Sequence, residues 1–353
     1  MTVRNTAGGR QNQIQFLRFL AFLHVFGLHV ESWCFIDYPL WNGGLSAVTF
    51  FFMLSGMLTG YSAYGRDIQV NLRVIGKDMW KRIRRMYPLY FLTTVFLTYR
   101  VNMLGELVYG GDRFRDDFIQ LVKNLLLLQS WFPDGFFSFN GVGWYLSTLL
   151  FLNLFNLPMV FLLNKIGQKK RCNEVFFITI VLLLSLTVAY SLMTYNDLVH
   201  FLQYIFPPAR LGQYFVAMII GYMIRTAQEK NTLPNGSTAF FSILEAGALL
   251  FWVVTLFLET ERWSSRLVFW VLPNIILIGV FMIGRGCVST LFKAKPLVLL
   301  GDISFECYLI HPVIITMWQH VDKDTIASEI ICVACVLTYT ILTSLFINKK
   351  HPM

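Results

Sequence analysis

The sequence predicts an all-α fold, a polytopic bundle of transmembrane helices. The chain has 353 residues, of which 56% are hydrophobic and 14% are charged, whereas a soluble domain carries about a quarter charged residues. Apolar runs of about 20 residues, each long enough to cross a bilayer, recur along the whole chain. The net charge of +9 is typical of Lys and Arg kept on the cytoplasmic side of a membrane. We therefore expect no nucleic-acid partner.

We expect one integral domain over residues 1–353, with about ten spans and both termini in the cytoplasm. This topology places 20 of the 29 Lys and Arg residues inside and eight outside, as the positive-inside rule requires. No small-residue cleavage site follows the first span, so we interpret it as an anchor and not as a signal peptide. The expected spans are 14–33, 43–63, 86–104, 142–164, 174–194, 208–225, 239–258, 267–284, 298–319 and 326–347.

The six cysteines do not predict a disulfide framework. On this topology Cys34 faces outside, two cysteines face inside, and the others lie within spans. Cys332-x-x-Cys335 has redox spacing, but it lies in an apolar run without a βαβ context, so we expect a structural role. We expect no metal and no bound cofactor.

Arg18 and His29 are the most informative pair in the first span. Placing an ionisable side chain within a membrane span costs free energy, so such a residue marks a functional path by default. Eleven residues make three helical turns plus roughly 20°, so both side chains share one face about 16 Å apart along the axis. An imidazole titrates near neutrality, which suits a general base. A histidine bonded to a nearby backbone carbonyl is the alternative, and His24, on another face, is the internal control.

A basic inner loop at 65–86 ends in Arg82-Ile-Arg84-Arg85-Met-Tyr-Pro88. Arg82 and Arg85 are three residues apart and share a helix face, and arginine forks suit phosphate oxygens. Pro88 is expected in the first turn of the third span, where a helix N-terminus favours anions. These cations predict a phosphorylated donor, although a topological stop signal would also explain most of them.

Three further segments carry candidate site residues. Ser55-Gly56 permits close helix packing in lipid, and packing alone could explain it. Glu306 and His311 lie with Asp302 in one late span, which is more ionisable groups than packing needs. Arg210 is expected at the outer mouth of the sixth span. The outer segment 105–141 is the longest gap between spans, and long ordered loops are often functional.

Taken together, these motifs resemble the integral-membrane acyltransferase family 3. Arg18-x10-His29 matches the paired residues of its first span, and Phe51-Phe-x-Leu-Ser55-Gly56 matches its second span. Arg82-x-x-Arg85 before Tyr-Pro resembles its basic motif, and Phe206-x-x-x-Arg210 with Gly221 resembles its sixth span. Gly301-x-Ile-Ser304-Phe-x-x-Tyr308-Leu-x-His311 matches its late span. One departure is Trp144-Tyr-Leu-Ser147-Thr-Leu149, where many members have an acid in place of the leucine.

The resemblance implies an O-acyltransferase of the bacterial inner membrane. Its donor substrate would be acetyl-CoA or another acyl-CoA, and its acceptor a hydroxyl of an extracytoplasmic glycan or lipid-linked sugar. Arg82 and Arg85 would hold the CoA phosphates, while Arg18 and His29 would line a path between the two faces. His29 would act as general base or as a transient acyl carrier, and the sequence does not choose between them. Arg210, Trp144 and the segment 105–141 would help to hold the acceptor.

A proton-coupled transporter or flippase is the competing interpretation. It would use His29 and Glu306 as relay groups. Neither an inverted repeat nor a matched pair of broken spans is visible in the sequence, which favours the acyltransferase.

Overall fold

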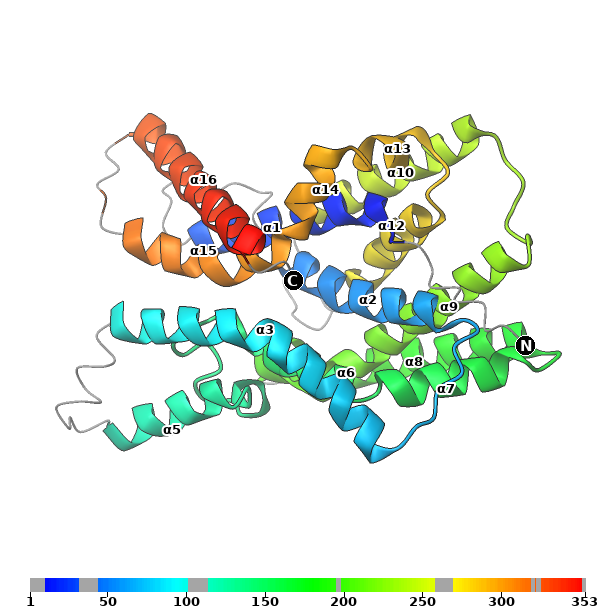
Figure 1. Ribbon diagram of the computed structural model, residues 1–353, viewed down its shortest axis with the longest axis horizontal. Coiled ribbons are helices and arrows are strands. Elements are labelled where there is room, and N and C mark those ends of the chain that lie inside the picture. The colour runs from blue at the N-terminus through cyan, green and yellow to red at the C-terminus, as the bar shows by residue number, and fades with distance from the viewer. Residues whose placement is uncertain are drawn as a thin grey trace.

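Helices make up all the regular structure in residues 10–31, 44–100, 114–194, 198–257, 269–318, 321 and 325–350, which the computed structural model describes. No strand occurs in these ranges, so the all-α prediction is confirmed for them (Figure 1). Cys34 and the first part of the 105–141 segment, residues 105–113, lie outside the described residues.

The long helices are α1 (Asn12–Glu31), α2 (Gly44–Ala63), α3 (Leu72–Arg100), α8 (Cys172–Met193), α9 (Leu211–Glu229), α10 (Thr238–Leu256) and α16 (Ile326–Lys350). The shorter ones are α5 (Phe114–Leu125), α6 (Gly143–Asn153), α7 (Asn156–Gly167), α12 (Val271–Ile283), α13 (Cys287–Phe292), α14 (Lys295–Asp302) and α15 (Ser304–Trp318). The 3₁₀ turns η2 (Gln129–Trp131) and η4 (Pro207–Arg210) and the π-helical turn η3 (Phe201–Ile205) connect them.

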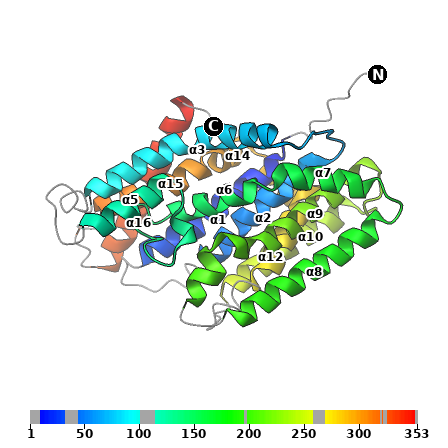
Figure 2. The same ribbon diagram turned by 90° about the horizontal axis from the view of Figure 1, so that it is seen from below.

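The centre of the bundle is the packing of α2 against α9. In both views α2 lies between α12 on one side and α6 and α7 on the other (Figure 1 and Figure 2). Glycines allow the two backbones to approach closely: a Cβ on Gly56 would overlap the carbonyl of Tyr214, and one on Gly60 would overlap that of Met218. The close packing expected at Ser55-Gly56 is therefore confirmed, and small residues serve it as they do in membrane bundles.

Five helices of the described chain, α1, α2, α8, α10 and α16, are long and apolar enough to cross a membrane. The pairs α6–α7 and α14–α15 pass the same test together but are bent by 44° and 59°, which brings the total to as many as seven. The helices α3, α9 and α12 occupy other expected spans without passing it. The count of ten spans and the location of the termini stay predictions.

The two bent pairs differ from the expectation that the sequence contains no matched pair of broken spans. The breaks fall at Leu154–Phe155 and at Ile303. Pro158 has no N–H for the Leu154 carbonyl, and Gly301 lies two residues before Ile303, so each break has a proline or glycine beside it.

The third span begins earlier than expected. Helix α3 starts at Leu72, where the side chain of Asn71 accepts a hydrogen bond from the Val74 N–H at 3.0 Å and caps the helix. The prediction that Pro88 stands in the first turn is wrong, because it lies inside this helix. Pro88 leaves the carbonyl of Arg84 without its helical donor, and both residues are exposed, so water can reach that carbonyl.

Candidate active site

Two cavities meet at one wall residue, Tyr308. The larger, called the basic cavity, has a volume of about 650 Å³ and the polar lining Arg10, Gln15, Arg18, Ser55, Arg82, Arg85, Tyr145, Asn153, Asp302, Ser304, Tyr308 and Asn348. The smaller, called the aromatic cavity, has a volume of about 250 Å³ and is lined by Val25, Leu28, His29, Leu45, Val48, Phe137, Val142, Trp144, His200, Tyr204 and Tyr308. Helices α1, α2, α6 and α15 contribute to both.

The basic cavity gathers positive charge from two separate parts of the chain, residues 10–18 and 82–85. Four arginines, residues 10, 18, 82 and 85, line its described wall beside one acid, Asp302. Arg10 forms an ion pair with Asp302. Arg82 donates from Nε to Asp78 at 2.7 Å and from Nη1 to Asn153 at 3.2 Å. The predicted convergence of Arg82 and Arg85 on one face is confirmed, and the structure adds Arg18 to them.

Arg85 differs from its neighbours in having no partner within the described chain. It is exposed at the cavity and makes no hydrogen bond or ion pair with a described residue. Arg18 is half-buried and donates from Nη1 to Gln15 at 3.0 Å. Guanidinium groups with spare donors at an open cavity suit an anionic ligand with several oxygens.

The aromatic cavity presents His29 among rings. Trp144 is buried, and its ring centroid lies 5.0 Å from that of Tyr204. The Tyr308 hydroxyl, at the wall shared with the basic cavity, donates to the Val142 carbonyl at 2.9 Å. At 250 Å³ the space is smaller than a cavity for a drug-sized ligand, which takes about 300–1,000 Å³. It therefore takes only the reacting ends of larger molecules.

His29 lines the aromatic cavity, and it also makes the contact with a backbone carbonyl that the alternative interpretation predicts. It is half-buried near the end of α1, which is one uninterrupted helix, so its predicted axial separation from Arg18 is confirmed. Its Nδ1 lies 2.7 Å from the Val25 carbonyl oxygen. A carbonyl oxygen only accepts, so Nδ1 carries the hydrogen and Nε2 is the basic nitrogen. His24 instead packs edge-on against Trp252, with ring centroids 5.0 Å apart.

Arg210 lies behind the aromatic cavity and is not among the residues that line it. It is fully buried, and it donates from Nε and Nη2 to the Tyr204 carbonyl at 2.9 and 2.6 Å. Its guanidinium carbon also lies over the rings of Tyr204 and Phe52, at 4.6 and 5.3 Å from their centroids. Arg210 thus fixes the wall that carries Tyr204, and its predicted contact with substrate stays a prediction.

The remaining candidates also cluster here. Ser55 lines the basic cavity. Glu306 is fully buried, and its Oε1 accepts from Asn348 at 2.8 Å, while Oε2 has no hydrogen-bond partner in the described chain. His311 is fully buried and lines neither cavity, but its Nε2 lies 3.3 Å from Nδ1 of His29.

Comparison with known proteins bears on this arrangement. A family model described as an acyltransferase domain matches residues 11–349. The chain belongs to acyltransferase family 3. It is also 31% identical over 142 residues to "Acyltransferase MdmB" of Streptomyces mycarofaciens, and that match covers 37% of this chain and 34% of the relative. The chain thus spans about a third of the length of that curated relative. No solved structure matches.

The family match confirms the predicted resemblance to acyltransferase family 3. Leu149, where this chain departs from the family pattern, lines the basic cavity. The position where many members carry an acid therefore lines the same cavity as Arg18 and Arg85, and here it adds no negative charge.

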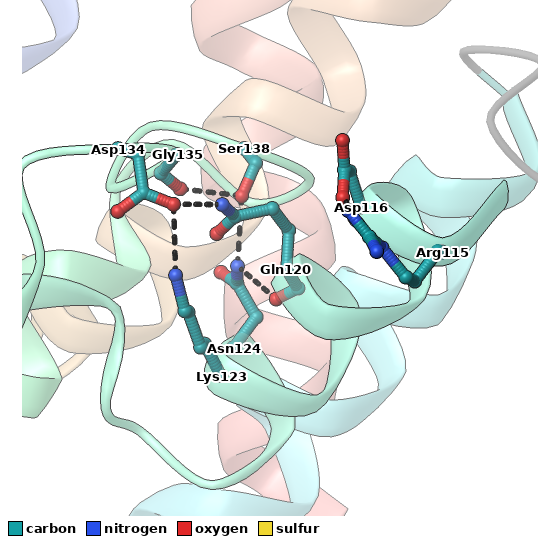
Figure 3. Close-up of polar contacts among 8 residues, drawn as sticks. All are labelled: Arg115, Asp116, Gln120, Lys123, Asn124, Asp134, Gly135 and Ser138. Carbon is teal, nitrogen blue, oxygen red and sulfur yellow. Dashed lines mark hydrogen bonds and ion pairs between the residues drawn. The ribbon is translucent and has the colours of Figure 1, made fainter. Parts of the chain in front are cut away.

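A polar clip holds one wall of the aromatic cavity. Figure 3 shows side chains of α5 pointing toward the following loop, where Lys123 bonds to Asp134 at 2.8 Å and Asn124 donates to Ser138 at 2.9 Å. The Lys123 ammonium lowers the pKa of the exposed Asp134 carboxyl. The clip fixes the loop that carries Phe137 to the cavity.

Sequence reasoning missed Phe137, His200 and Tyr204. His200 lies over Tyr204 with the two ring planes 16° apart, and its pKa is lowered to about 4 by burial and, secondarily, by the positive charge of Arg210. His200 is therefore neutral at physiological pH and can offer a hydrogen bond at the cavity without adding charge. An aromatic cluster beside Pro207-Pro208 was the only local signal for this region.

Proposed function

We propose that this protein is an O-acyltransferase of the bacterial plasma membrane that moves an acyl group from cytosolic acyl-CoA to a hydroxyl of an extracytoplasmic sugar or polysaccharide. Acetyl is the acyl group with which we propose to test it. The observation that carries the proposal is the meeting of an arginine-lined cavity and a histidine-bearing aromatic cavity at Tyr308. Membership of acyltransferase family 3 supports the reaction class.

The donor side follows from charge. The phosphates of acyl-CoA need cationic partners, and Arg18, Arg82 and Arg85 offer guanidinium groups around one space. Those phosphates do not enter an apolar bundle, because desolvating them is too costly. Only the acyl end of the flexible arm would continue past Tyr308 toward His29.

The acceptor side follows from shape and proton chemistry. A sugar presents apolar C–H faces that stack on aromatic rings such as Trp144 and Tyr204, both of which line the aromatic cavity. His29 Nε2 takes the proton of the attacking hydroxyl, whose oxygen forms the new ester bond to the thioester carbonyl carbon. The carbon–sulfur bond breaks, and the departing CoA thiolate takes up the proton from the imidazolium. The products are an acylated acceptor and CoA thiol.

The acyl-carrier alternative uses the same nitrogen. His29 Nε2 would attack the thioester first and release CoA, and the acceptor hydroxyl would then take the acyl group from the imidazole. Incubation with radiolabelled acetyl-CoA alone, followed by a denaturing quench, separates the two routes. Label retained on the wild-type chain and absent from His29→Gln indicates a carrier. An unlabelled chain in this incubation, together with label on the acceptor in a second incubation that contains one, indicates a general base.

Replacement of His29 tests the proposal directly. Purified His29→Gln should transfer no label from acetyl-CoA to a panel of glycosides, whereas His24→Gln should transfer it at close to the wild-type rate. His24 is the matched control because it lies on the same helix and contacts Trp252 instead of lining a cavity. A His29→Gln variant that keeps most of the wild-type rate would show that the proton chemistry is wrong.

Opposite sides for donor and acceptor are a separate prediction. Single cysteines at Asn71 and Asp116, both exposed, in a background without reactive native thiols, should label from opposite faces of the membrane. The cysteine at position 71 should resist an impermeant maleimide in intact cells, and the one at 116 should react. Reaction of both in intact cells would exclude transfer across the membrane, although not acyl transfer itself.

A proton-coupled carrier is the second candidate, and the broken spans favour it. Bent helix pairs such as α6–α7 and α14–α15 are typical of transporters, and Glu306 would serve as the second relay group beside His29. A carrier would move solute with a pH gradient and leave no covalent label on any acceptor. The transfer assay with labelled acetyl-CoA therefore decides between the two functions.

A further inference from the structure

A second histidine stands directly behind His29. His311 on α15 is fully buried, and its Nε2 lies 3.3 Å from His29 Nδ1 although the two residues are 282 positions apart in sequence. Because His311 lines neither cavity, it cannot touch a donor or acceptor placed there. We propose that His311 is a positioning residue that fixes the tautomer and the orientation of the His29 ring, and this inference rests on the proposed function.

The hydrogen-bond partners assign the protons of the pair. His311 Nδ1 lies 3.1 Å from the carbonyl oxygen of Cys307, which only accepts, so Nδ1 carries the hydrogen. A neutral imidazole has one N–H, so His311 Nε2 is an acceptor. His29 Nδ1 then donates to that nitrogen as well as to the carbonyl of Val25. Both contacts hold the same tautomer of His29, with its lone pair on Nε2.

Rings hold His311 in place. The centroid of its imidazole lies 5.7 Å from that of Phe22 and 6.0 Å from that of Tyr308, with the His311 plane at 69° and 58° to them. Phe26 closes another side at 6.3 Å. A buried ring packed against three others has little freedom to turn, so the acceptor that it offers to His29 stays in one place.

A neutral partner suits this location. A carboxylate would orient the imidazole equally well, but it would add a charge inside an apolar bundle, which is expensive. His311 provides the acceptor without that charge. When His29 takes a proton from the acceptor substrate, its Nδ1–H still has two acceptors, the Val25 carbonyl and His311 Nε2. The pair therefore supports both protonation states of His29 without rearrangement.

Two amides form the matched test. In His311→Gln the amide group extends to the place of Nε2 and still offers an acceptor to His29. In His311→Asn it stops near the place of Nδ1, so it keeps the contact toward Cys307 and loses the one to His29. We expect His311→Asn to lower kcat by about 10- to 100-fold, as loss of an orienting partner does for metal-bound histidines. His311→Gln should recover most of this loss.

Binding of acetyl-CoA is the control for a folding defect, because a misfolded variant would lose donor affinity. The Kd of acetyl-CoA, measured by calorimetry, should be the same in His311→Asn, His311→Gln and the wild type, because His311 does not line the basic cavity. Wild-type kcat in His311→Asn would overturn the inference, provided that His29→Gln is inactive. Activity in His29→Gln would instead overturn the proposed function.

The wild-type protein supplies a measurement that needs no His311 variant. With ¹⁵N-labelled histidine, the His29 resonances are assigned by their absence from His29→Gln. The expected signature is a protonated Nδ1 and an unprotonated Nε2. The opposite tautomer at His29 would overturn the inference even if every His311 variant failed to fold.

Discussion

Arg85 gives the sharpest test of the donor site, because its neighbour Arg84 is a control of equal charge. Both are exposed on α3, but only Arg85 is among the residues that line the basic cavity. A hydrogen bond from a guanidinium to phosphate contributes about 1.5–3 kcal/mol, or about 10- to 150-fold in Kd. Because Arg85 is open to solvent, we expect the lower end of that range, about tenfold.

The assay is calorimetric titration of purified Arg85→Ala and Arg84→Ala with acetyl-CoA. Arg84→Ala removes the same charge from the same helix, and screening in physiological salt should limit its effect to about twofold. Arg85→Lys should recover only part of the affinity, because an ammonium lacks the planar fork.

A donor without phosphates separates the contact from a general loss of affinity. Acetylpantetheine should bind wild type and Arg85→Ala equally. Two results would refute the assignment of Arg85 to phosphate. One is an equal loss of acetyl-CoA affinity in Arg84→Ala and Arg85→Ala, and the other is a loss of acetylpantetheine affinity in Arg85→Ala as large as its loss of acetyl-CoA affinity. Arg85 would then have a role only in topology.

Two further predictions concern packing and the clip. Gly60→Ala should destabilise the protein by about 1–3 kcal/mol in thermal unfolding, because its Cβ would overlap the α9 backbone. The control Gly247→Ala, with open space around it, should be neutral or stabilising by up to about 1 kcal/mol. Equal effects of the two substitutions would contradict the packing argument. Asp134→Asn should raise KM for the acceptor by about two- to fivefold through loss of an exposed ion pair, without changing acetyl-CoA affinity. Because the pKa of Asp134 is lowered in the folded protein, the ion pair contributes to stability above the ordinary aspartate pKa of about 3.9, and this contribution is lost as pH falls through the lower folded value. An acceptor KM that is unchanged in Asp134→Asn would show that the clip has no role in acceptor binding.

The features that the sequence predicted well are those set by local geometry. Arg18 and His29 lie on one continuous helix, so the period and rise of that helix alone fix their relative placement. The same holds for Arg82 and Arg85, three residues apart on α3. Gly56 also carried a readable signal, because small residues mark close contacts between membrane helices.

The features that escaped prediction depend on tertiary convergence. Phe137 reaches the aromatic cavity from a loop and His200 from the turn before η3, and no periodicity connects those segments with His29. Arg210 directly precedes α9, the sixth expected span, but its burial against a carbonyl and two rings was not expected. Pro88 was expected in the first turn of a helix because proline prefers that place, but α3 begins earlier, at Leu72. For Phe137 and His200 the deciding partners are distant in sequence.

The separation of the two cavities has a kinetic consequence. On the proposed function, phosphate binding energy is released around Arg85, whereas bonds are made and broken beside His29, beyond the shared wall at Tyr308. Contacts made equally in the ground state and the transition state change binding and leave kcat alone. Substitutions in the basic cavity should therefore change donor affinity, and those at His29 and His311 should change kcat. A variant at Tyr308, which belongs to both cavities, is the one expected to change both.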